Sequence, residues 1–214
     1  NASVLTLASP SATNSLGDNK DFVIDGIVPT VASVSSTITD GTYKTNDVIP
    51  ILITFSEAVT VTGTPQLTLE TGTNDASVNY ATGSGSSILT FYYTVAAGHA
   101  SSDLDYISNS ALALNGGTIK DAATNDATLT LPAIDNASAL AGNKALVIDG
   151  VTPTIASVTS TSNDGSYMIG DVVPITVTFS EVVNVVTTGG TPTLTLETGS
   201  NDAAVSYTSG TGTN

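Results

Sequence analysis

The sequence contains no cysteine, no tryptophan and no arginine. Without cysteine no disulfide can hold the chain, so its fold must depend on buried apolar side chains, bound ions or both. Four lysines stand against 19 acidic residues, which gives a formal net charge of -15. Because proteins bind nucleic acid through Lys and Arg, this composition excludes nucleic acid as a partner. Anionic membrane surfaces are disfavoured for the same reason. No apolar run approaches the roughly 18 residues of a membrane span, so we expect no membrane insertion.

The residues that catalysis needs are also scarce. His99 is the only histidine, and a transition-metal site needs several imidazole or thiolate ligands. No serine stands in the Gly-x-Ser-x-Gly turn that exposes a nucleophile. A module without tryptophan lacks the aromatic-lined cleft that a glycosidase would need around its paired carboxylates. We therefore expect a protein that is not an enzyme.

Thr, Ser, Ala, Gly, Asn and Val dominate the chain, and this composition is typical of short strands joined by tight turns. Apolar residues alternate with Thr along 175–179, so Ile175, Val177 and Phe179 are predicted to share one buried face. The pattern predicts an all-β fold in which residues 108–115 form one helical turn that stops at Gly116. The predicted strands are 31–38, 48–56, 65–70, 76–82, 87–95, 117–120 and 127–131, with a short additional strand at 145–149.

An internal repeat with a period of 124 residues organises the chain. Residues 27–61 align with 151–185 without a gap, and 20 of these 35 positions are identical. Residues 22–26 (Phe-Val-Ile-Asp-Gly) match 146–150 (Leu-Val-Ile-Asp-Gly) at the same spacing. Such self-similarity indicates an array of near-copies. The predicted pieces are the tail of one repeat (1–26), a complete repeat (27–150) and the first part of another (151–214).

Four motifs carry a resemblance to a known family. They are the linker Asp25-Gly-x-x-Pro-Thr, the turn Asp40-Gly-x-Tyr, the run Ile-Thr-Phe-Ser-Glu-Ala-Val at 53–59 and Gly-Gly-Thr-Ile-Lys-Asp-Ala-Ala-Thr-Asn at 116–125. In these the chain resembles the bacterial Ig-like repeats that form extender regions of giant secreted adhesins, including RTX-type adhesins. The resemblance implies Ig-like antiparallel β-sandwich repeats in a linear tandem array, with calcium at the domain junctions. It also implies an extracellular place on the bacterial cell surface and a role in cell attachment and biofilm formation.

Strand direction gives a separate argument for a metal site. Because successive antiparallel strands alternate in direction, the loop after 48–56 and the loop after 117–120 should meet at the pole where the chain enters the repeat. Glu57 opens the first loop, Asp121, Asn125 and Asp126 lie in the second, and the incoming linker supplies Asp25. Oxygen ligands of this kind suit Ca²⁺. The sequence therefore predicts calcium as a cofactor at this pole.

Two further sets of acids extend this prediction. Asp149 and Glu181 are the repeat equivalents of Asp25 and Glu57, so the next junction should reuse them. Asp103 and Asp105 form an acidic pair at the end of a predicted strand and are candidates for a second, weaker site. The competing interpretation treats each acid as an ordinary turn residue that bonds to the nearby backbone. Both interpretations stay open at this point.

The partners expected from the sequence are neighbouring repeats of the same protein. One alternative is an extracellular filament or surface-layer subunit, in which residues 151–214 of one chain pair head-to-tail with residues 1–26 of another by strand complementation. Together these pieces would still lack the equivalents of 88–124. The other alternative is a glycan-binding module, for which Tyr92, Tyr93 and Tyr106 are the candidate aromatics. We expect Tyr93 to face the core and Tyr92 the surface of the sheet.

Overall fold

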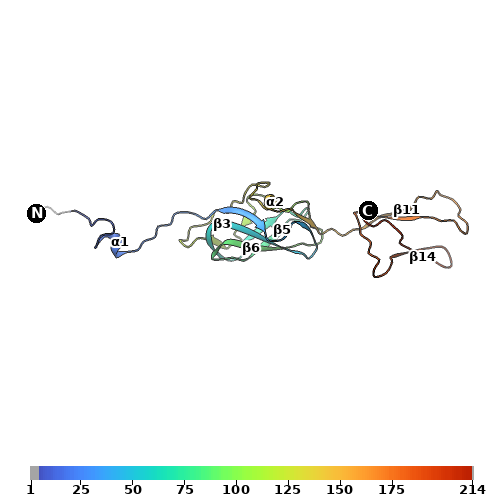
Figure 1. Cartoon of the computed structure of the whole chain (residues 1–214), viewed down its shortest axis with the longest axis horizontal. Helices are drawn as coiled ribbons and strands as arrows, with labels where there is room; N and C mark the ends of the chain where they lie inside the picture. The colour runs from blue at the N-terminus through green and yellow to red at the C-terminus, as the bar shows by residue number, and fades with distance from the viewer. Residues whose placement is uncertain (1–4, 214) are drawn as a thin grey trace. The chain divides into compact units, whose positions relative to one another are not determined.

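The computed structural model describes residues 5–213, so residues 1–4 of the predicted first piece lie outside it, as does Asn214. The chain divides into two compact units, one ending at Gly150 and the other beginning at Val151. The regular secondary structure of both units is almost entirely β-strand (Figure 1). Unit 1 contains α1 (Leu16–Asn19), β1 (Val31–Ser36), β2 (Gly41–Lys44), β3 (Val48–Thr62), β4 (Gln66–Leu69), β5 (Ala76–Thr82), β6 (Ser86–Thr94), β7 (Ala100–Ser101), β8 (Leu112–Ala113), β9 (Thr118–Lys120), α2 (Leu140–Asn143) and β10 (Leu146–Asp149). Unit 2 contains β11 (Ile155–Ser160), β12 (Ile175–Phe179), β13 (Thr193–Leu196) and β14 (Ala203–Ser206).

Unit 1 has the character of a β-sandwich. Its larger sheet runs β1-β3-β6-β5-β4-β8, with β9 added along the far half of β3, and every pair in it is antiparallel. Its smaller sheet runs β2-β10-β7. There β10 pairs antiparallel with β7 and parallel with β2. The predicted all-β fold is therefore confirmed, with one parallel pair among the antiparallel ones.

The alternating apolar residues of the long strands form one core. In β3, Ile49, Ile51, Ile53 and Phe55 are all buried, and the residues between them are exposed or partly buried. A period of two places successive side chains on opposite faces of a sheet, so one face of β3 is apolar along its whole first half. β6 contributes its own buried series from Leu89 onward. The predicted core faces of these strands are confirmed.

Several local predictions were wrong. Residues 108–115 form no helical turn, because Leu112 and Ala113 pair with β4 as strand β8. Residues 127–131 form no regular strand and make only an isolated bridge, from Thr128 to Thr30. β3 continues to Thr62, so Glu57 lies inside a strand and not at the start of a loop. The short strands β2 and β7 and the two helices were not predicted.

Unit 2 reproduces the first strand pairing of unit 1. In unit 1 the β1–β3 register joins Val31 to Phe55, with a bulge before Ser33. In unit 2 the β11–β12 register joins Ile155 to Phe179, with a bulge at the equivalent place. Its β13–β14 hairpin pairs antiparallel like β4 and β5. The internal sequence similarity thus corresponds to the same local strand geometry.

Candidate metal centre

Three carboxylates from distant parts of unit 1 converge. Asp25, Glu57 and Asp121 each offer an oxygen atom, and the three oxygens lie within 4.8 Å of one another. Asp25 is exposed, Glu57 is partly buried and Asp121 is buried. Asp25 belongs to the linker before β1, Glu57 to β3 and Asp121 to the turn after β9. We call these three residues the acidic triad.

Glu57 lies close to the other two triad residues because the pairing of β3 with β6 becomes irregular around residue 57. Between the pairs Thr54–Ile88 and Val59–Ser86, β3 advances five residues while β6 advances two. Extra residues of this kind bend a strand and turn side chains away from their normal direction. The bend also separates the half of β3 that pairs with β1 from the half that pairs with β9. Glu57 therefore lies within β3, at its bend, and not in a loop.

Asp121 is fixed by the turn that follows β9. Its carboxylate accepts a hydrogen bond from the backbone N–H of Asn125 at 2.8 Å and another from the side-chain amide of Asn125, also at 2.8 Å. The same amide nitrogen donates to the backbone carbonyls of Asp25 (3.2 Å) and Ile27 (3.3 Å). Asn125 thus ties the turn to the linker through its nitrogen and positions the triad.

The linker is held along its length. The Asp25 carboxylate accepts from the N–H of Ile27, which forms a tight local turn. Thr30 exchanges two bonds with Ser56, the residue before Glu57: its N–H donates to the Ser56 hydroxyl, and its carbonyl accepts from the Ser56 N–H. The Pro29 carbonyl accepts from the N–H of Thr128. These contacts bring Asp25 to Glu57 although 32 positions separate them.

The charges of the triad repel one another. Partial burial raises the pKa of Glu57, and the negative charges of Asp25 and Asp121 raise it further. Within the described residues, the ion pairs join Lys120 to Asp126 and Lys144 to Asp40, and neither includes a triad member. A cluster of acids without a cationic neighbour gains stability from a bound cation.

The donor set fits calcium. Ca²⁺ takes six to eight oxygen ligands at about 2.3–2.6 Å, so two of its ligands stand at most about 5 Å apart. The 4.8 Å limit on the triad oxygens falls within that span. The carbonyl oxygens of Asp25 and Ile27 lie beside the triad and are further hard donors. The position of these two carbonyls could not be predicted from the sequence, although the Asp-Gly-x-x-Pro linker indicates an ordered backbone there.

The remaining acids predicted for this pole play other parts. Asp126 is exposed and forms an ion pair with Lys120. In unit 2, one carboxylate oxygen of Glu181 is buried with no hydrogen-bond partner among the described residues. An unpaired buried acceptor is costly, and a cation would relieve that cost. The joint role predicted for Asp149 of unit 1 and Glu181 of unit 2 stays a prediction.

Asp103 and Asp105 differ in exposure and in their hydrogen-bond partners. Asp103 is exposed and accepts from the N–H of Leu146 at 3.2 Å. Asp105 is buried, and its Oδ1 accepts from the N–H of Tyr106 at 2.9 Å. The N–H groups of Leu140 and Ala141 lie near this carboxylate, but among the described residues none makes a hydrogen bond of normal geometry to its Oδ2. Burial raises the pKa of Asp105, while the N–H groups of Tyr106, Ala141 and Leu140 partly offset that rise.

The buried Asp105 should make the stability of unit 1 depend on pH. A raised pKa means that the folded state binds the proton more tightly than the unfolded state, so stability rises as pH falls. The effect is confined to the window between the ordinary pKa of 3.8 and the raised pKa of the folded state. Urea unfolding at a series of pH values from neutral down towards the ordinary pKa, followed by circular dichroism, measures it. The pKa of Glu57 is raised as well, so Glu57 would add a pH dependence of the same direction. Every protein compared in this experiment should therefore carry Glu57→Gln. Asp105→Asn should make the free energy of unfolding depend less on pH, whereas Asp75→Asn, at an exposed position, should not. If the two variants showed the same change of stability with pH, Asp105 would not be its source.

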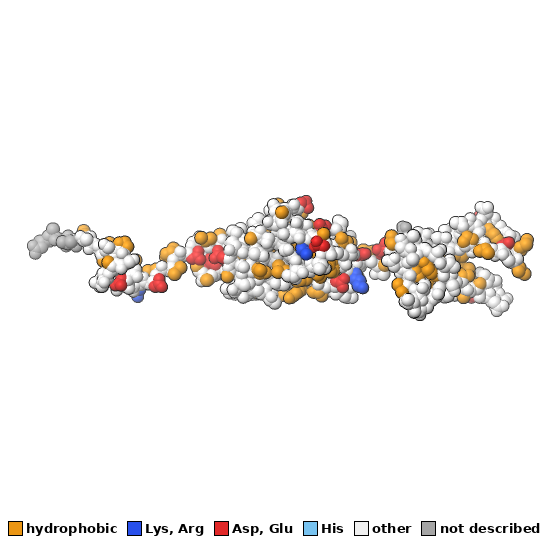
Figure 2. Space-filling view, in the orientation of Figure 1, with side chains coloured by type: hydrophobic (Ala, Val, Ile, Leu, Met, Phe, Trp, Pro, Cys, Tyr) orange, Lys and Arg blue, Asp and Glu red, His pale blue; other side chains and the backbone are white. Residues whose placement is uncertain are grey.

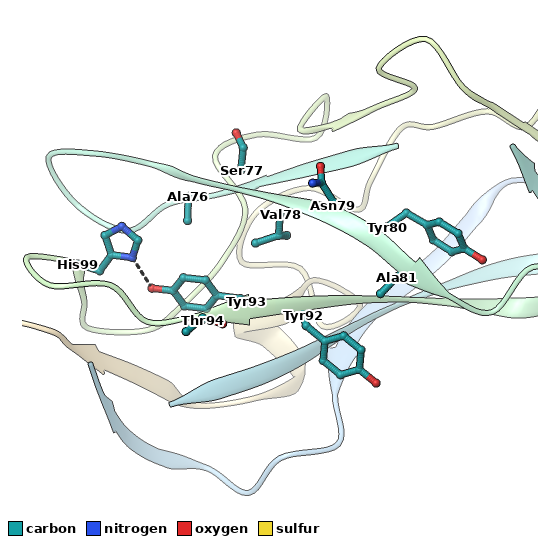
Figure 3. Close-up of a pocket in the computed structure, with 10 residues that line it drawn as sticks. All are labelled: Ala76, Ser77, Val78, Asn79, Tyr80, Ala81, Tyr92, Tyr93, Thr94 and His99. Atoms are coloured by element: carbon teal, nitrogen blue, oxygen red, sulfur yellow. Dashed lines mark hydrogen bonds between the residues drawn. The ribbon is translucent and has the colours of Figure 1, made fainter. Parts of the chain in front are cut away.

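The tyrosines do not form an aromatic platform. Tyr93 and Tyr106 are buried, and Tyr106 donates its hydroxyl to the Pro132 carbonyl at 2.6 Å. Tyr92 is exposed, and Figure 3 shows its ring pointing away from Tyr93. Both residues line an open depression formed mainly by β5 and β6. The expected inward direction of Tyr93 and outward direction of Tyr92 are confirmed.

His99 has a structural role in the turn between β6 and β7. Its Nδ1 accepts from the N–H of Ala96, so the Tyr93 hydroxyl, 2.9 Å from the same nitrogen, must donate as well (Figure 3). Burial raises the pKa of Tyr93 to about 12, which keeps this hydroxyl protonated.

No family model, curated protein or solved structure matches the chain. Among the described residues, no helix has the length and apolar character to span a membrane. Acidic side chains are scattered over the displayed face, with few basic ones among them (Figure 2).

Proposed function

We propose that this chain is a part of a tandem array of Ig-like β-sandwich repeats that serves as the extended shaft of a bacterial surface adhesin. Calcium bound by Asp25, Glu57 and Asp121 would fix the linker to the repeat it enters. The observation that carries the calcium proposal is the convergence of the three oxygens within 4.8 Å. The adhesin proposal, with its extracellular location and its role in attachment and biofilm formation, rests on the resemblance of the linker and strand motifs.

The position of the triad explains what a bound ion would do mechanically. Asp25 lies in the linker, whereas Glu57 and Asp121 belong to the body of the repeat. A cation shared by all three would neutralise their repulsion and tie the linker to the sheet. A linker so tied bends less, and a stack of such repeats would hold a terminal binding domain away from the cell surface.

The tandem arrangement is supported by geometry as well as by sequence. The β1–β3 register recurs as the β11–β12 register. The bonds between Thr30 and Ser56 recur between Thr154 and Ser180, each with an N–H to hydroxyl distance of 3.0 Å. These bonds lie next to Glu57 and Glu181, so the surroundings of the glutamate are repeated along with it.

Thermal unfolding with and without calcium tests the proposal. An ion that binds only the folded protein stabilises it by about 1.4 kcal/mol when its free concentration is about tenfold above Kd. For a domain of this size that corresponds to a rise in Tm of roughly 5 °C. The chain should be melted in millimolar calcium and after exhaustive chelation, with ellipticity in the far ultraviolet as the signal.

Glu57→Gln is the decisive variant for this site. It removes one ligand charge, so the calcium-dependent rise in Tm should disappear. It also removes the repulsion from Asp25 and Asp121, so the chelated protein should melt higher than the chelated wild type. Glu70→Gln is the matched control, because Gln retains the oxygen that accepts from the Gly72 N–H. If the wild type had the same Tm with calcium and with chelator, the calcium proposal would be contradicted.

A further inference from the structure

The N-terminal segment, residues 5–26, exposes apolar side chains in a regular series. Leu5 and Leu7 are each 90% exposed, Leu16 is 70% exposed and Ile24 is 91% exposed. Backbone hydrogen bonds within the segment join near neighbours, such as Ala12 to Ser9 and Ser15 to Ala12. Apolar side chains stand out along it in Figure 2. Exposed apolar series of this kind mark interaction surfaces.

The copy of this segment inside unit 1 indicates what covers it. Residues 129–150 follow at the repeat spacing of 124, and there Leu140 is 0% and Ile148 is 2% exposed. β10 of this copy lies between β2 and β7, parallel to the first and antiparallel to the second. The copy therefore closes the smaller sheet and fills a groove that the rest of the repeat leaves open.

The residues that anchor the copy also occur in the N-terminal segment. The Asn143 side chain donates to the Val34 carbonyl at 3.0 Å, and Lys144 pairs with Asp40 at 3.1 Å. Asn19 and Lys20 hold the equivalent positions. Leu16 and Ile24 are likewise identical to the buried Leu140 and Ile148.

The N-terminal segment has the local conformation of the docked copy. In α1 the Lys20 N–H donates to the Leu16 carbonyl at 2.9 Å, as the Lys144 N–H donates to Leu140 in α2 at 2.9 Å. The Asn19 side chain donates to the Ser15 carbonyl at 2.9 Å, as that of Asn143 does to Ala139 at 3.0 Å. A segment already ordered in its bound form loses less entropy on docking.

We infer that residues 5–26 are a docking segment whose partner is the open groove of a second repeat of this kind. In the complex, residues 22–25 add a strand parallel to the strand equivalent to β2. Leu16 and Ile24 enter the core, while Asn19 and Lys20 bond to the groove wall. This inference rests on the proposed repeat array. In it, residues 5–26 supply to a second repeat the segment that residues 129–150 supply to unit 1.

Two of the positions at which the segment differs from the copy bring in a larger side chain. Phe22 stands where the buried Leu146 lies, so it would press on the groove itself. Asp18 stands where Gly142 lies, and an ideal Cβ on Gly142 would be 2.0 Å from the carbonyl oxygen of Asn136, which belongs to the copy's own loop. Phe22 should therefore lower the stability of a docked complex, and Asp18 should make the loop before it follow a different path from that of the copy, without changing the register.

A segment swap in the full chain tests the inference. Residues 129–150 are replaced by a second copy of residues 5–26, and the rest of the protein is left unchanged. A second chimera carries Phe22→Leu and Asp18→Gly in the transplanted copy. We expect both chimeras to melt cooperatively, the first within about 15 °C of the native protein and the second closer to it.

Alanine variants show whether the transplanted segment occupies the groove. Leu16→Ala with Ile24→Ala in the transplanted copy should lower the Tm, whereas the same pair in the original N-terminal segment should not. The inference is overturned if neither chimera melts cooperatively, or if the alanine pair in the transplanted copy leaves the Tm unchanged. The calcium-dependent shift of the unaltered protein is a separate readout, so failure of the swap is distinguishable from failure of the calcium proposal.

Discussion

Replacing Leu140 by alanine should lower the free energy of unfolding of unit 1 by about 2–5 kcal/mol, the range for removing a buried leucine side chain. Leu140 is fully buried and begins α2, which packs against β1. Alanine is a good helix former, so α2 itself should persist and the loss should come from the cavity. Urea unfolding followed by circular dichroism gives the change as a lower midpoint with an unchanged slope.

The sequence similarity between residues 5–26 and 129–150 supplies a control for this variant. Leu16→Ala makes the same chemical change at the equivalent position of α1, where the side chain is exposed. It should change the free energy of unfolding by no more than about 0.5 kcal/mol. Equal losses for the two variants would mean that residues 5–26 are packed in solution, contrary to the exposure described above.

The alternating residues of the long strands could be predicted from sequence because their burial depends on a period of two. Ile49, Ile51 and Ile53 alternate with partly buried residues, and the larger sheet accordingly buries one face of β3. The smaller sheet could not be predicted in this way. β10 pairs with β2 across about 100 residues of chain. β7 of this sheet, like β8 of the larger one, has only two residues and is too short to show any period.

The acidic triad was reached from strand direction, although one step of that argument was wrong. Glu57 was placed in a loop after 48–56, whereas it lies where β3 bends and continues. Asp25, Glu57 and Asp121 still come together, because the bend in β3 lies at the end of the repeat where the loop after residue 56 was expected. Asn125 was expected as an oxygen ligand, yet its nitrogen bonds to Asp121 and the linker. The sequence does not show whether the oxygen or the nitrogen of an asparagine side-chain amide faces a carboxylate.

Replacing Gly150 by alanine should cost about 3 kcal/mol, near the upper end for forcing extra volume into a packed site. An ideal Cβ on Gly150 would lie 2.3 Å from the Ala96 carbonyl oxygen and 2.9 Å from that of His99. Neither oxygen can retreat freely, because the His99 carbonyl accepts from the Gly150 N–H at 2.7 Å and the Ala96 carbonyl accepts from the His99 N–H at 3.2 Å. The added methyl group would therefore break the contacts that hold the end of unit 1 to the turn between β6 and β7.

Gly26→Ala is the matched comparison, because Gly26 occupies the equivalent place in the Asp-Gly linker and nothing lies within 4 Å of its ideal Cβ. It should leave the Tm nearly unchanged, whereas Gly150→Ala should lower it by roughly 10 °C. The two positions share sequence surroundings and differ in what packs against them, so the contrast isolates the packing at Gly150. If both variants melted like the wild type, the turn would have room to move. The end of unit 1 would then lack the fixed geometry that a stiff array requires of its repeats.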